Sequence, residues 1–490
     1  MVAQPRRIAA RALKDYVGRS LGPVVGLRMG GGVREETADS CIYFVTTGYL
    51  MQYMIHKQHT NVTHLIIDEV HERSIAADVL CYLMRKMLIN NPALRLILMS
   101  ATMFTDIYRD YFTSYRGHCF GDLNSLHVGV RRFESTVMYL EDLCERADDE
   151  HKFNNSIASV AKRALRHIGR LRVFDDGCVL PTMDLLNIQY NLVQLLIDQM
   201  CPLGSGVLVF VSGIMDMHEL SERLKVSKKY KLFFLHSQIP VEDQPRIFLP
   251  PSSHAIKVVI ATNAGESSIT IPDIDCVICF GLNHESRLNL KTHHRQMVKC
   301  WISQASAIQR AGRTGRVREG VVFRLYTRSL FESFESFNRA EITTTPLEDT
   351  ILDLRGAFES SPDFEGVVPV LENLIEPPDT STVEIAFSQL YINQMISEPS
   401  EDGCLTDWGK FCSQIPYTLR LKRMIALGIC MGIGMEAVVM AASISRNDSI
   451  FHGPFPFLYK DASAFNTSVV NCFLRNSKSP GGDLATPKSD

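Results

Sequence analysis

Short apolar runs alternate along the chain with longer amphipathic stretches, and several of the runs end in polar residues. Four runs show this pattern most clearly: HLIIDEV from residue 64, RLILMSAT from 95, GVLVFVSG from 206 and KVVIATNAGE from 257. Runs of this kind suit strands that are buried on both faces of a parallel sheet. Because ligands bind at the carboxyl ends of such strands, the polar tails are expected to face a ligand. The pattern therefore predicts an α/β protein.

Two groups of these units are expected, over residues 1–117 and 118–339. The pattern weakens over 141–184, which we interpret as an insertion, where Lys162, Arg163, Arg166 and Arg170 have helical spacing. A solvated helix is the favoured interpretation of this basic stretch, and an RNA contact is the alternative. Beyond residue 339 the apolar spacing becomes helical, and PPDTST at 377–382 predicts a link and a helix cap. Residues 476–490 have the composition of a disordered tail.

Composition narrows the class of protein only slightly. The 490 residues allow about three or four domains. The net charge is −3, so any binding of RNA has to come from local basic patches. Thirteen cysteines, an odd number, favour a reducing intracellular compartment, nuclear or cytoplasmic, over a disulfide scaffold or secretion. Cys276 and Cys279 have CxxC spacing, but on a strand they would face opposite sides, which disfavours a metal or redox site.

Neither a membrane span nor a targeting peptide is favoured. No run of about 18 uncharged apolar residues occurs, so no transmembrane helix is expected. The arginine-containing first 17 residues could pass for a mitochondrial transit peptide, but the motifs described below explain them better.

The string Asp68-Glu69-Val70-His71 follows the first apolar run and is the strongest chemical signal. Two adjacent carboxylates at a strand end suit nucleotide chemistry: one can hold Mg²⁺ through its water shell, and the other can activate the attacking water. A plain charged turn is the alternative. Ser100 and Thr102 follow the next run, and their hydroxyls could couple this loop to the RNA side.

A second string, QRAGRTGR at residues 309–316, places two arginines three residues apart among small residues. The guanidinium groups of Arg313 and Arg316 could reach one anion together, as suits phosphate oxygens and the charge on a γ-phosphate. Gln309 could position the attacking water. A basic surface turn is the alternative.

DEVH, SAT and QRAGRTGR, in this order, resemble the DEAH-box family of superfamily 2 ATP-dependent RNA helicases. QPRRIAA at 4–10, TTG at 46–48, VFVSG at 209–213 and TNAGESSITI at 262–271 resemble further motifs of that family. The likeness covers roughly residues 1–450 apart from the insertion.

The resemblance implies two RecA-like lobes, a winged-helix region over 340–404 and a partial helical ratchet over 405–475. It implies ATP or another NTP with Mg²⁺ as cofactors, and single-stranded RNA with a 3′ overhang, with possible protein cofactors, as partners. It assigns hydrolysis to Glu69, Gln309, Arg313 and Arg316. Nucleotide contacts would come from Asp68, Glu69, His71, Ser100, Thr102, Gly265, Gln309, Arg313 and Arg316, with Asp68 and Glu69 toward the metal. RNA contacts would come from Arg6, Arg7, Thr47, Gly48, Ser212, Thr262 and Thr270.

The family's phosphate-cradling loop, GxxxxGK[ST], does not occur in the 490 residues. Backbone N–H groups and a lysine of that loop hold the phosphates. We therefore expect the chain as given to bind ATP poorly and hydrolyse little. A truncated reading of a normal helicase is favoured over a true variant, since the hydrolysis residues remain. The alternative function is a non-catalytic RNA-binding scaffold derived from a helicase, and a DNA helicase is a weaker third interpretation.

Overall fold

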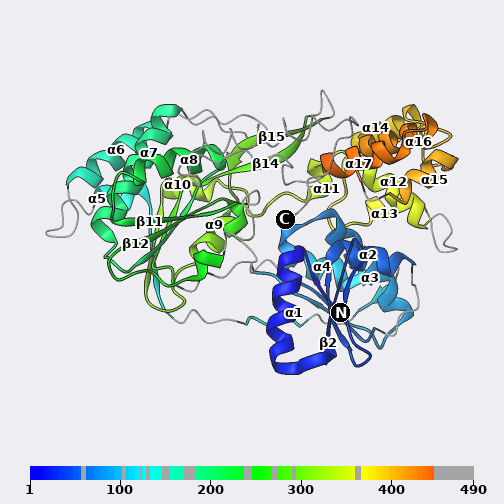
Figure 1. Ribbon diagram of the computed structural model, residues 1–490, viewed down its shortest axis with the longest axis horizontal. Coiled ribbons are helices and arrows are strands. Elements are labelled where there is room, and N and C mark those ends of the chain that lie inside the picture. Colours follow the sequence, from blue (N-terminus) through cyan, green and yellow to red (C-terminus); the bar gives the residue numbers. More distant parts are fainter. Residues whose placement is uncertain are drawn as a thin grey trace, which may run out of the picture.

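The computed structural model describes residues 1–56, 62–101, 106–115, 117–120, 124–128, 133–145, 155–169, 182–236, 245–266, 271, 273–289, 294–358, 366–415 and 417–445. Two lobes, each a sheet with helices, lie side by side, and a helical region lies beside the first of them (Figure 1). The α/β fold class is thereby confirmed. Thr102, Arg170, Thr270 and the predicted tail at 476–490 lie outside the described residues.

The first lobe is a six-stranded sheet with the strand order β3-β2-β4-β1-β5-β6. The pairings are parallel except between β2 and β3. In spatial order the strands are β3 (Val33–Glu35), β2 (Val25–Met29), β4 (Ile42–Thr46), β1 (Val2–Gln4), β5 (His64–Ile67) and β6 (Arg95–Leu98). The helical segments are α1 (Arg7–Leu21), η1 (Gly22–Val24), α2 (Thr47–His56), η2 (Val70–Glu72), α3 (Ile75–Asn90) and α4 (Asp106–Thr113), and a small ladder joins β7 (Ser114–Tyr115) to β8 (His118–Cys119).

The strand β6 corrects one expectation. The RLIL run was expected to be buried on both faces, yet β6 is an edge strand and Ile97 is 43% exposed. An edge strand has a neighbour on one side, and no described element covers this side chain fully. The apolar pattern identified a strand here but did not give its place in the sheet.

The second lobe is a six-stranded, fully parallel sheet with the order β11-β12-β10-β13-β16-β9. The central strands β10, β12 and β13 are buried at every position, as the continuous apolar runs predict. The sheet consists of β11 (Tyr230–Leu235), β12 (Ile256–Ala261), β10 (Gly206–Phe210), β13 (Cys276–Cys279), β16 (Gly320–Arg324) and β9 (Ser135–Met138). Its helical segments are α5 (Leu140–Glu145), α6 (Asn155–Ile168), α7 (Met183–Met200), α8 (Ile214–Leu224), η4 (Pro245–Phe248), η5 (Asn263–Gly265), α9 (Gln304–Ala311) and α10 (Arg328–Glu332).

Two predictions made for this lobe can be compared with the structure. Cys276 and Cys279 belong to different apolar clusters on the two faces of the sheet, as the strand alternation predicts. In α6, Ile157, Ala161 and Ile168 are buried, whereas the basic positions that the structure describes, 162, 163 and 166, are exposed. This arrangement is that of an amphipathic helix on the lobe surface, with its basic face in solvent.

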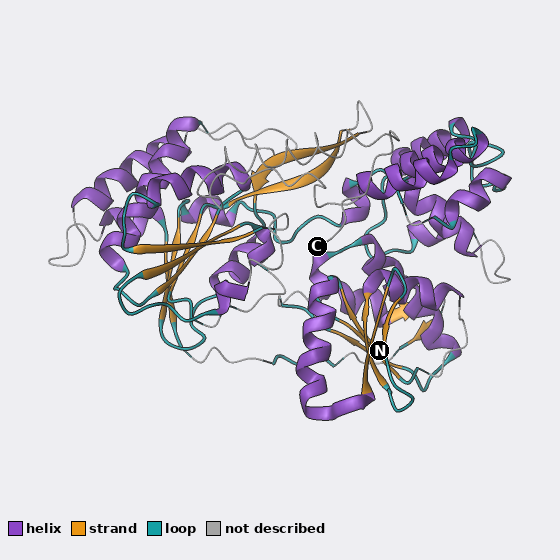
Figure 2. Cartoon of the chain, viewed as in Figure 1, coloured by secondary structure: helices purple, strands orange, loops and turns teal. Residues whose placement is uncertain are grey.

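An antiparallel hairpin, β14 (Leu282–Asn289) and β15 (His294–Trp301), projects from the second lobe toward the helical region (Figures 1 and 2). It follows β13 directly, after Gly281, whose φ is +80°. A Cβ on Gly281 would lie 2.5 Å from Cδ1 of Tyr326, so the entry to the hairpin requires a glycine.

The helical region packs on the first lobe, with which it shares one apolar cluster. It contains α11 (Glu341–Thr344), α12 (Glu348–Phe358), α13 (Val367–Glu372), α14 (Thr380–Ile392), α15 (Asp407–Ser413), α16 (Leu419–Cys430) and α17 (Gly434–Ser445). The predicted cap is present, since the Asp379 carboxylate accepts the Ser381 N–H. The apolar stretch after 419 forms two helices, because Gly432 adopts a φ of +75° between them.

Candidate functional site

The acidic loop after β5 is held in an unusual backbone conformation. Glu69 and Arg73 both have left-handed φ values, 55° and 51°, on either side of the turn η2. A non-glycine residue in this region costs about 1–3 kcal/mol and persists where its surroundings fix it. Here the Val70 N–H donates to the Met99 carbonyl, and the Tyr108 hydroxyl donates to the Val70 carbonyl at 2.6 Å.

Asp68 is oriented by the strand beside its own. Ala3 of β1 pairs with Ile67 of β5, so the next residues, Gln4 and Asp68, lie side by side. The Gln4 amide donates to Oδ2 of Asp68 at 2.7 Å, and the Glu69 N–H donates to Oδ1 at 2.8 Å. Gln4 is 2% exposed, so the carboxylate is fixed from inside the lobe.

His71 joins the acidic loop to the end of β6. Its Nε2 lies 3.5 Å from Oε2 of Glu69, and its Nδ1 is 3.3 Å from the Ala101 nitrogen. Burial lowers the pKa of His71, so the imidazole is neutral at pH 7 and its Nδ1 accepts the Ala101 N–H. The loops after β5 and β6, which the sequence placed at one edge of the sheet, are thus in contact.

The carboxylates of the acidic loop repel one another. Burial, followed by the neighbouring charges of Asp68 and Glu72, raises the pKa of Glu69 from 4.5 to about 7. At neutral pH Glu69 therefore exchanges readily between a proton-accepting and a protonated form, which suits a general base.

On the second lobe, the arginine loop (residues 310–316) is built around the buried carboxylate of Glu266. This carboxylate accepts Nε of Arg310 at 3.0 Å and the hydroxyl of Ser306, while Arg313 donates to the Glu266 backbone carbonyl. Arg310 is fully buried and also lies over the Phe210 ring, 4.9 Å from its centroid. Arg310 is therefore a structural residue that fixes this loop on the lobe.

Arg313 and Arg316 are partly buried, and their positive charges repel each other. Burial, and next the neighbouring charge of Arg316, lowers the pKa of Arg313 to about 10, and burial lowers the pKa of Arg316. Two guanidinium groups in such surroundings favour an anion between them. Nε2 of Gln309 is also buried and has no hydrogen-bond partner among the described residues.

The acidic loop and the arginine loop face each other across the two lobes. Arg313 lowers the pKa of Glu69 electrostatically, and Glu69 in turn favours the charged form of Arg313. Glu266 and Arg313 also act on His71. The structure thus brings together Asp68, Glu69 and His71 with Arg313, which the sequence placed in separate lobes.

These residues fit a Mg²⁺–nucleotide in their chemistry. Among the described residues no group of three or more His, Cys, Asp or Glu could hold a metal ion alone. Mg²⁺ usually takes one or two carboxylates together with waters and substrate phosphates, which suits Asp68 and Glu69. A cation there would offset the repulsion that raises the pKa of Glu69, and phosphate oxygens would offset the repulsion between Arg313 and Arg316.

Of the residues expected to bind RNA, those that the structure describes lie at the carboxyl ends of four strands but differ in accessibility. After β1, Arg6 is 3.3 Å from Glu72 and Arg7 is exposed, and at the start of α2 Thr47 is buried while Gly48 is exposed. The positions after β10 and β12 are less available. Ser212 and Thr262 are buried, and the Ser212 hydroxyl donates to Asp216. Gly265, which is expected to contact the nucleotide, is closely packed, since a Cβ there would lie 2.9 Å from the Ala261 Cβ.

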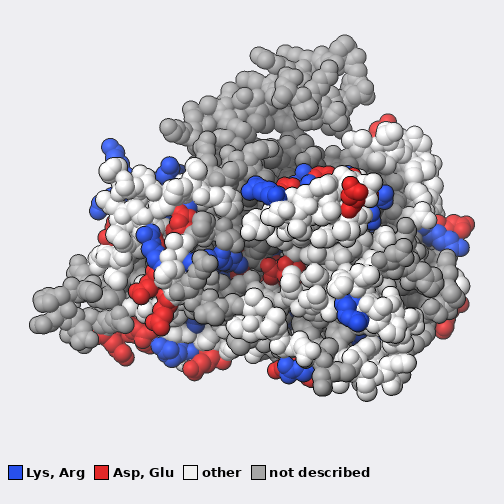
Figure 3. Space-filling view, turned by 90° about the horizontal axis from the view of Figure 1, so that it is seen from below, with Lys and Arg blue, Asp and Glu red and all other residues white. Residues whose placement is uncertain are grey.

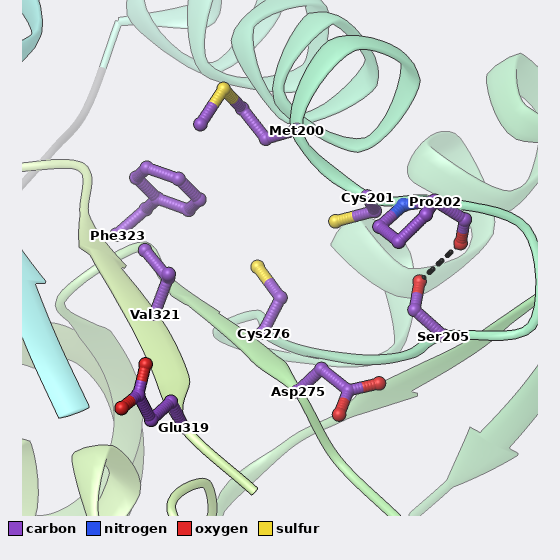
Figure 4. Close-up of a pocket in the computed structure, with 9 residues that line it drawn as sticks. All are labelled: Met200, Cys201, Pro202, Ser205, Asp275, Cys276, Glu319, Val321 and Phe323. Atoms are coloured by element: carbon purple, nitrogen blue, oxygen red, sulfur yellow. Dashed lines mark hydrogen bonds between the residues drawn. The ribbon is translucent and has the colours of Figure 1, made fainter. Parts of the chain in front are cut away.

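A cavity elsewhere in the second lobe is not this site. It lies near the amino ends of β10 and β13, with the side chains of Cys201 and Cys276 beside it (Figure 4). Ligands of parallel sheets bind at the opposite, carboxyl ends.

Figure 3 shows basic and acidic side chains interspersed on one face of the molecule. No helix within the described ranges is long and apolar enough to cross a membrane.

Sequence reasoning missed three residues that hold the site together. Gln4, Glu266 and Tyr108 position the acidic and arginine loops, as described above. Gln4 and Glu266 lie inside motif strings, and that was their only signal. Their partners are 64 and 44 residues away, so the contacts depend on which strands are neighbours.

Comparisons with known proteins find similarity to helicases. The helicase conserved C-terminal domain family matches residues 191–318. DExH-box ATP-dependent RNA helicase DExH1 of Arabidopsis thaliana is 29% identical over 475 residues, which cover 90% of this chain and 46% of that protein. ATP-dependent RNA helicase dhx29 of Xenopus laevis is 30% identical over 512 residues, which cover 92% of this chain and 36% of that protein.

A solved structure shares the fold. The crystal structure of the Escherichia coli DEAH/RHA helicase HrpB matches with a TM-score of 0.70 and 21% identity, over 98% of this chain and 55% of that one. The chain spans about a third to a half of the length of the curated relatives it matches.

Proposed function

This chain is a homologue of the DExH/DEAH-box ATP-dependent RNA helicases, and we propose that it carries the hydrolytic and RNA-contacting residues of such a motor. In this proposal nucleoside triphosphate hydrolysis between the two lobes drives translocation on RNA and its unwinding or remodelling. The observation that carries the proposal is the approach of Glu69 and Arg313, which come from different lobes and act on each other's pKa.

Each side chain has a role that follows from its place. Asp68, oriented by Gln4, would face the metal, and Glu69, with a pKa near 7, would accept the proton of the attacking water. Gln309 would orient that water through its amide. Bound Mg²⁺–nucleotide would supply the electrophilic phosphoryl group. Arg313 and Arg316 would stabilise charge on the phosphoryl oxygens, a contribution that reaches about 10³–10⁵ in rate for arginine fingers.

On the RNA side, Arg6, Arg7 and the Gly48 backbone are the accessible groups at the strand ends. Such groups suit phosphate contacts that do not read base sequence. We propose single-stranded RNA with a 3′ overhang as the substrate.

A second candidate, a non-catalytic RNA-binding scaffold, is favoured by one observation: the 490 residues contain no GxxxxGK[ST] string to cradle phosphates. One experiment separates the two functions. Binding of a fluorescent 3′-tailed RNA is followed by anisotropy, and phosphate release is measured with malachite green, with Glu69→Gln as the matched control.

Both candidates predict RNA binding by the chain. Turnover that requires Glu69 supports the motor and contradicts our expectation of little hydrolysis by this chain. RNA binding with the same phosphate release in the wild type and in Glu69→Gln supports the scaffold. The absence of RNA binding would refute both.

A further inference from the structure

Glu341, the first residue of α11, contacts the acidic loop of the first lobe through its backbone and its side chain. Its N–H donates to the Arg73 carbonyl at 3.0 Å, and its Oε2 accepts the Ile75 N–H at 3.2 Å. These two contacts lie on either side of Ser74, at the point where the acidic loop becomes α3. Glu341 therefore holds the end of the loop that carries Glu69.

The same carboxylate reaches the hairpin of the second lobe. Its Oε1 lies 3.3 Å from Nη2 of Arg295 on β15, where the hairpin extends toward α11 (Figure 1). The Glu341 side chain thus joins the acidic loop of the first lobe to the β14–β15 hairpin of the second lobe.

The side chain of Arg73 is held by groups other than Glu341. Its guanidinium donates to the buried carboxylate of Asp78 at 3.0–3.2 Å and lies 3.4 Å from Glu376. The Arg73 side chain is thereby anchored in the first lobe and the helical region. Its backbone carbonyl, in a left-handed residue, is the group that Glu341 holds.

The ion pair between Glu341 and Arg295 is too exposed to contribute much stability. The two side chains are 43% and 52% exposed, and pairs of this kind contribute about 0–1 kcal/mol. A weak contact can break and re-form within a working cycle at little cost. The ion pair is therefore important for its position between the acidic loop and the hairpin and not for the stability that it contributes.

We propose that RNA contacts the β14–β15 hairpin and that Glu341 is a positioning residue that couples this hairpin to the acidic loop, so that bound RNA changes the orientation of Glu69. This coupling rests on the proposed function. When the hairpin shifts, Arg295 displaces the Glu341 carboxylate through their ion pair. Glu341 is hydrogen-bonded to the Ile75 N–H and the Arg73 carbonyl, so these two backbone groups are displaced with it.

Hydrogen exchange with and without a 3′-tailed RNA tests the coupling on the full chain. Four variants are compared with the wild type: Glu341→Ala, Glu341→Gln, Arg295→Ala and the double variant Glu341→Gln/Arg295→Ala. The Glu341→Gln variant keeps an acceptor for the Ile75 N–H but loses the charge that faces Arg295. Glu332→Ala, at an exposed glutamate on α10, is the matched control for the loss of one acidic side chain.

In the wild type, RNA is expected to slow exchange both in the hairpin and in peptides over residues 68–75, the latter by at least threefold. In Glu341→Gln and Arg295→Ala, the hairpin is expected to respond as before, while the response of 68–75 falls to less than half. The double variant is expected to lose no more than either single variant, because one contact is removed in all three. Glu332→Ala is expected to behave as the wild type.

The outcomes separate the two proposals. If RNA binds without protecting the hairpin, or if residues 68–75 respond equally in the wild type and in Arg295→Ala, the coupling is wrong and the proposed function stands. If no RNA binds, the proposed function fails and the coupling fails with it. Arg295 is half exposed, so its alanine variant is expected to fold, and this readout does not depend on the stability of the Glu341 variants.

Discussion

Replacement of Glu69 by glutamine should stabilise the protein at alkaline pH and not at acidic pH. The pKa of Glu69 is raised from 4.5 to about 7 by burial and by the charges of Asp68 and Glu72. The folded protein therefore holds this proton more tightly than the unfolded chain, and the ionised carboxylate costs stability as the pH rises from 4.5 to 7. A shift of that size corresponds to at most about 3.5 kcal/mol, and partial exposure to solvent reduces it to about 1–2 kcal/mol.

Glu69→Gln removes this cost and keeps the shape of the side chain. At pH 8 the transition of the first lobe should rise by roughly 2–5 °C, and at pH 5, where Glu69 is mostly protonated, it should hardly change. Thermal unfolding followed by circular dichroism at the two pH values measures this difference. Glu384→Gln, at an exposed position on α14, is the control. A rise in melting temperature that is equal at both pH values, or absent at pH 8, would show that the folded protein does not raise the pKa of Glu69.

Three further predictions follow from other contacts. Arg6→Ala/Arg7→Ala should weaken binding of 3′-tailed RNA and reduce the slope of log K against log salt by about 1.4, measured by anisotropy at several salt concentrations; an unchanged slope would place the phosphates elsewhere. Lys422→Met should lower the free energy of unfolding, measured by urea denaturation, by about 2–4 kcal/mol, because the carboxylate of Asp353, 2.5 Å from Nζ of the buried Lys422, loses its cation; an unchanged free energy would show that the pair is dispensable. Gly281→Ala should cost on the order of 2–4 kcal/mol, because its Cβ would meet the ring of Tyr326, and an unaltered melting curve would contradict this.

The sequence predicted the sheet and the loops that share its edge, because parallel strands bring their carboxyl ends to one edge. Asp68 and Ser100, which follow successive runs in the sequence, follow neighbouring strands in the structure. Alternation along a strand also predicted that Cys276 and Cys279 face opposite sides. These inferences need only the spacing of residues along the chain.

Contacts between distant segments could not be predicted in this way. Nothing in the sequence pairs Gln4 with Asp68 or buries the Ser212 hydroxyl against Asp216, because each contact depends on the packing of a neighbouring element. The break at Gly432 has a weak signal in the sequence for a different reason. The apolar spacing is compatible with one continuous helix, and a single glycine within it is a weak signal.

The open side of β6 has a practical consequence for handling the protein. This strand has one partner, β5, among the described residues, so its other edge presents backbone N–H and C=O groups, and Ile97 on one face of the strand is partly exposed. Such a side is a template for another strand, and soluble proteins usually protect it with charges, proline or a covering element. In concentrated solution, molecules of this chain would therefore tend to join edge to edge. Dilute samples and a charged residue at position 97 should keep them apart.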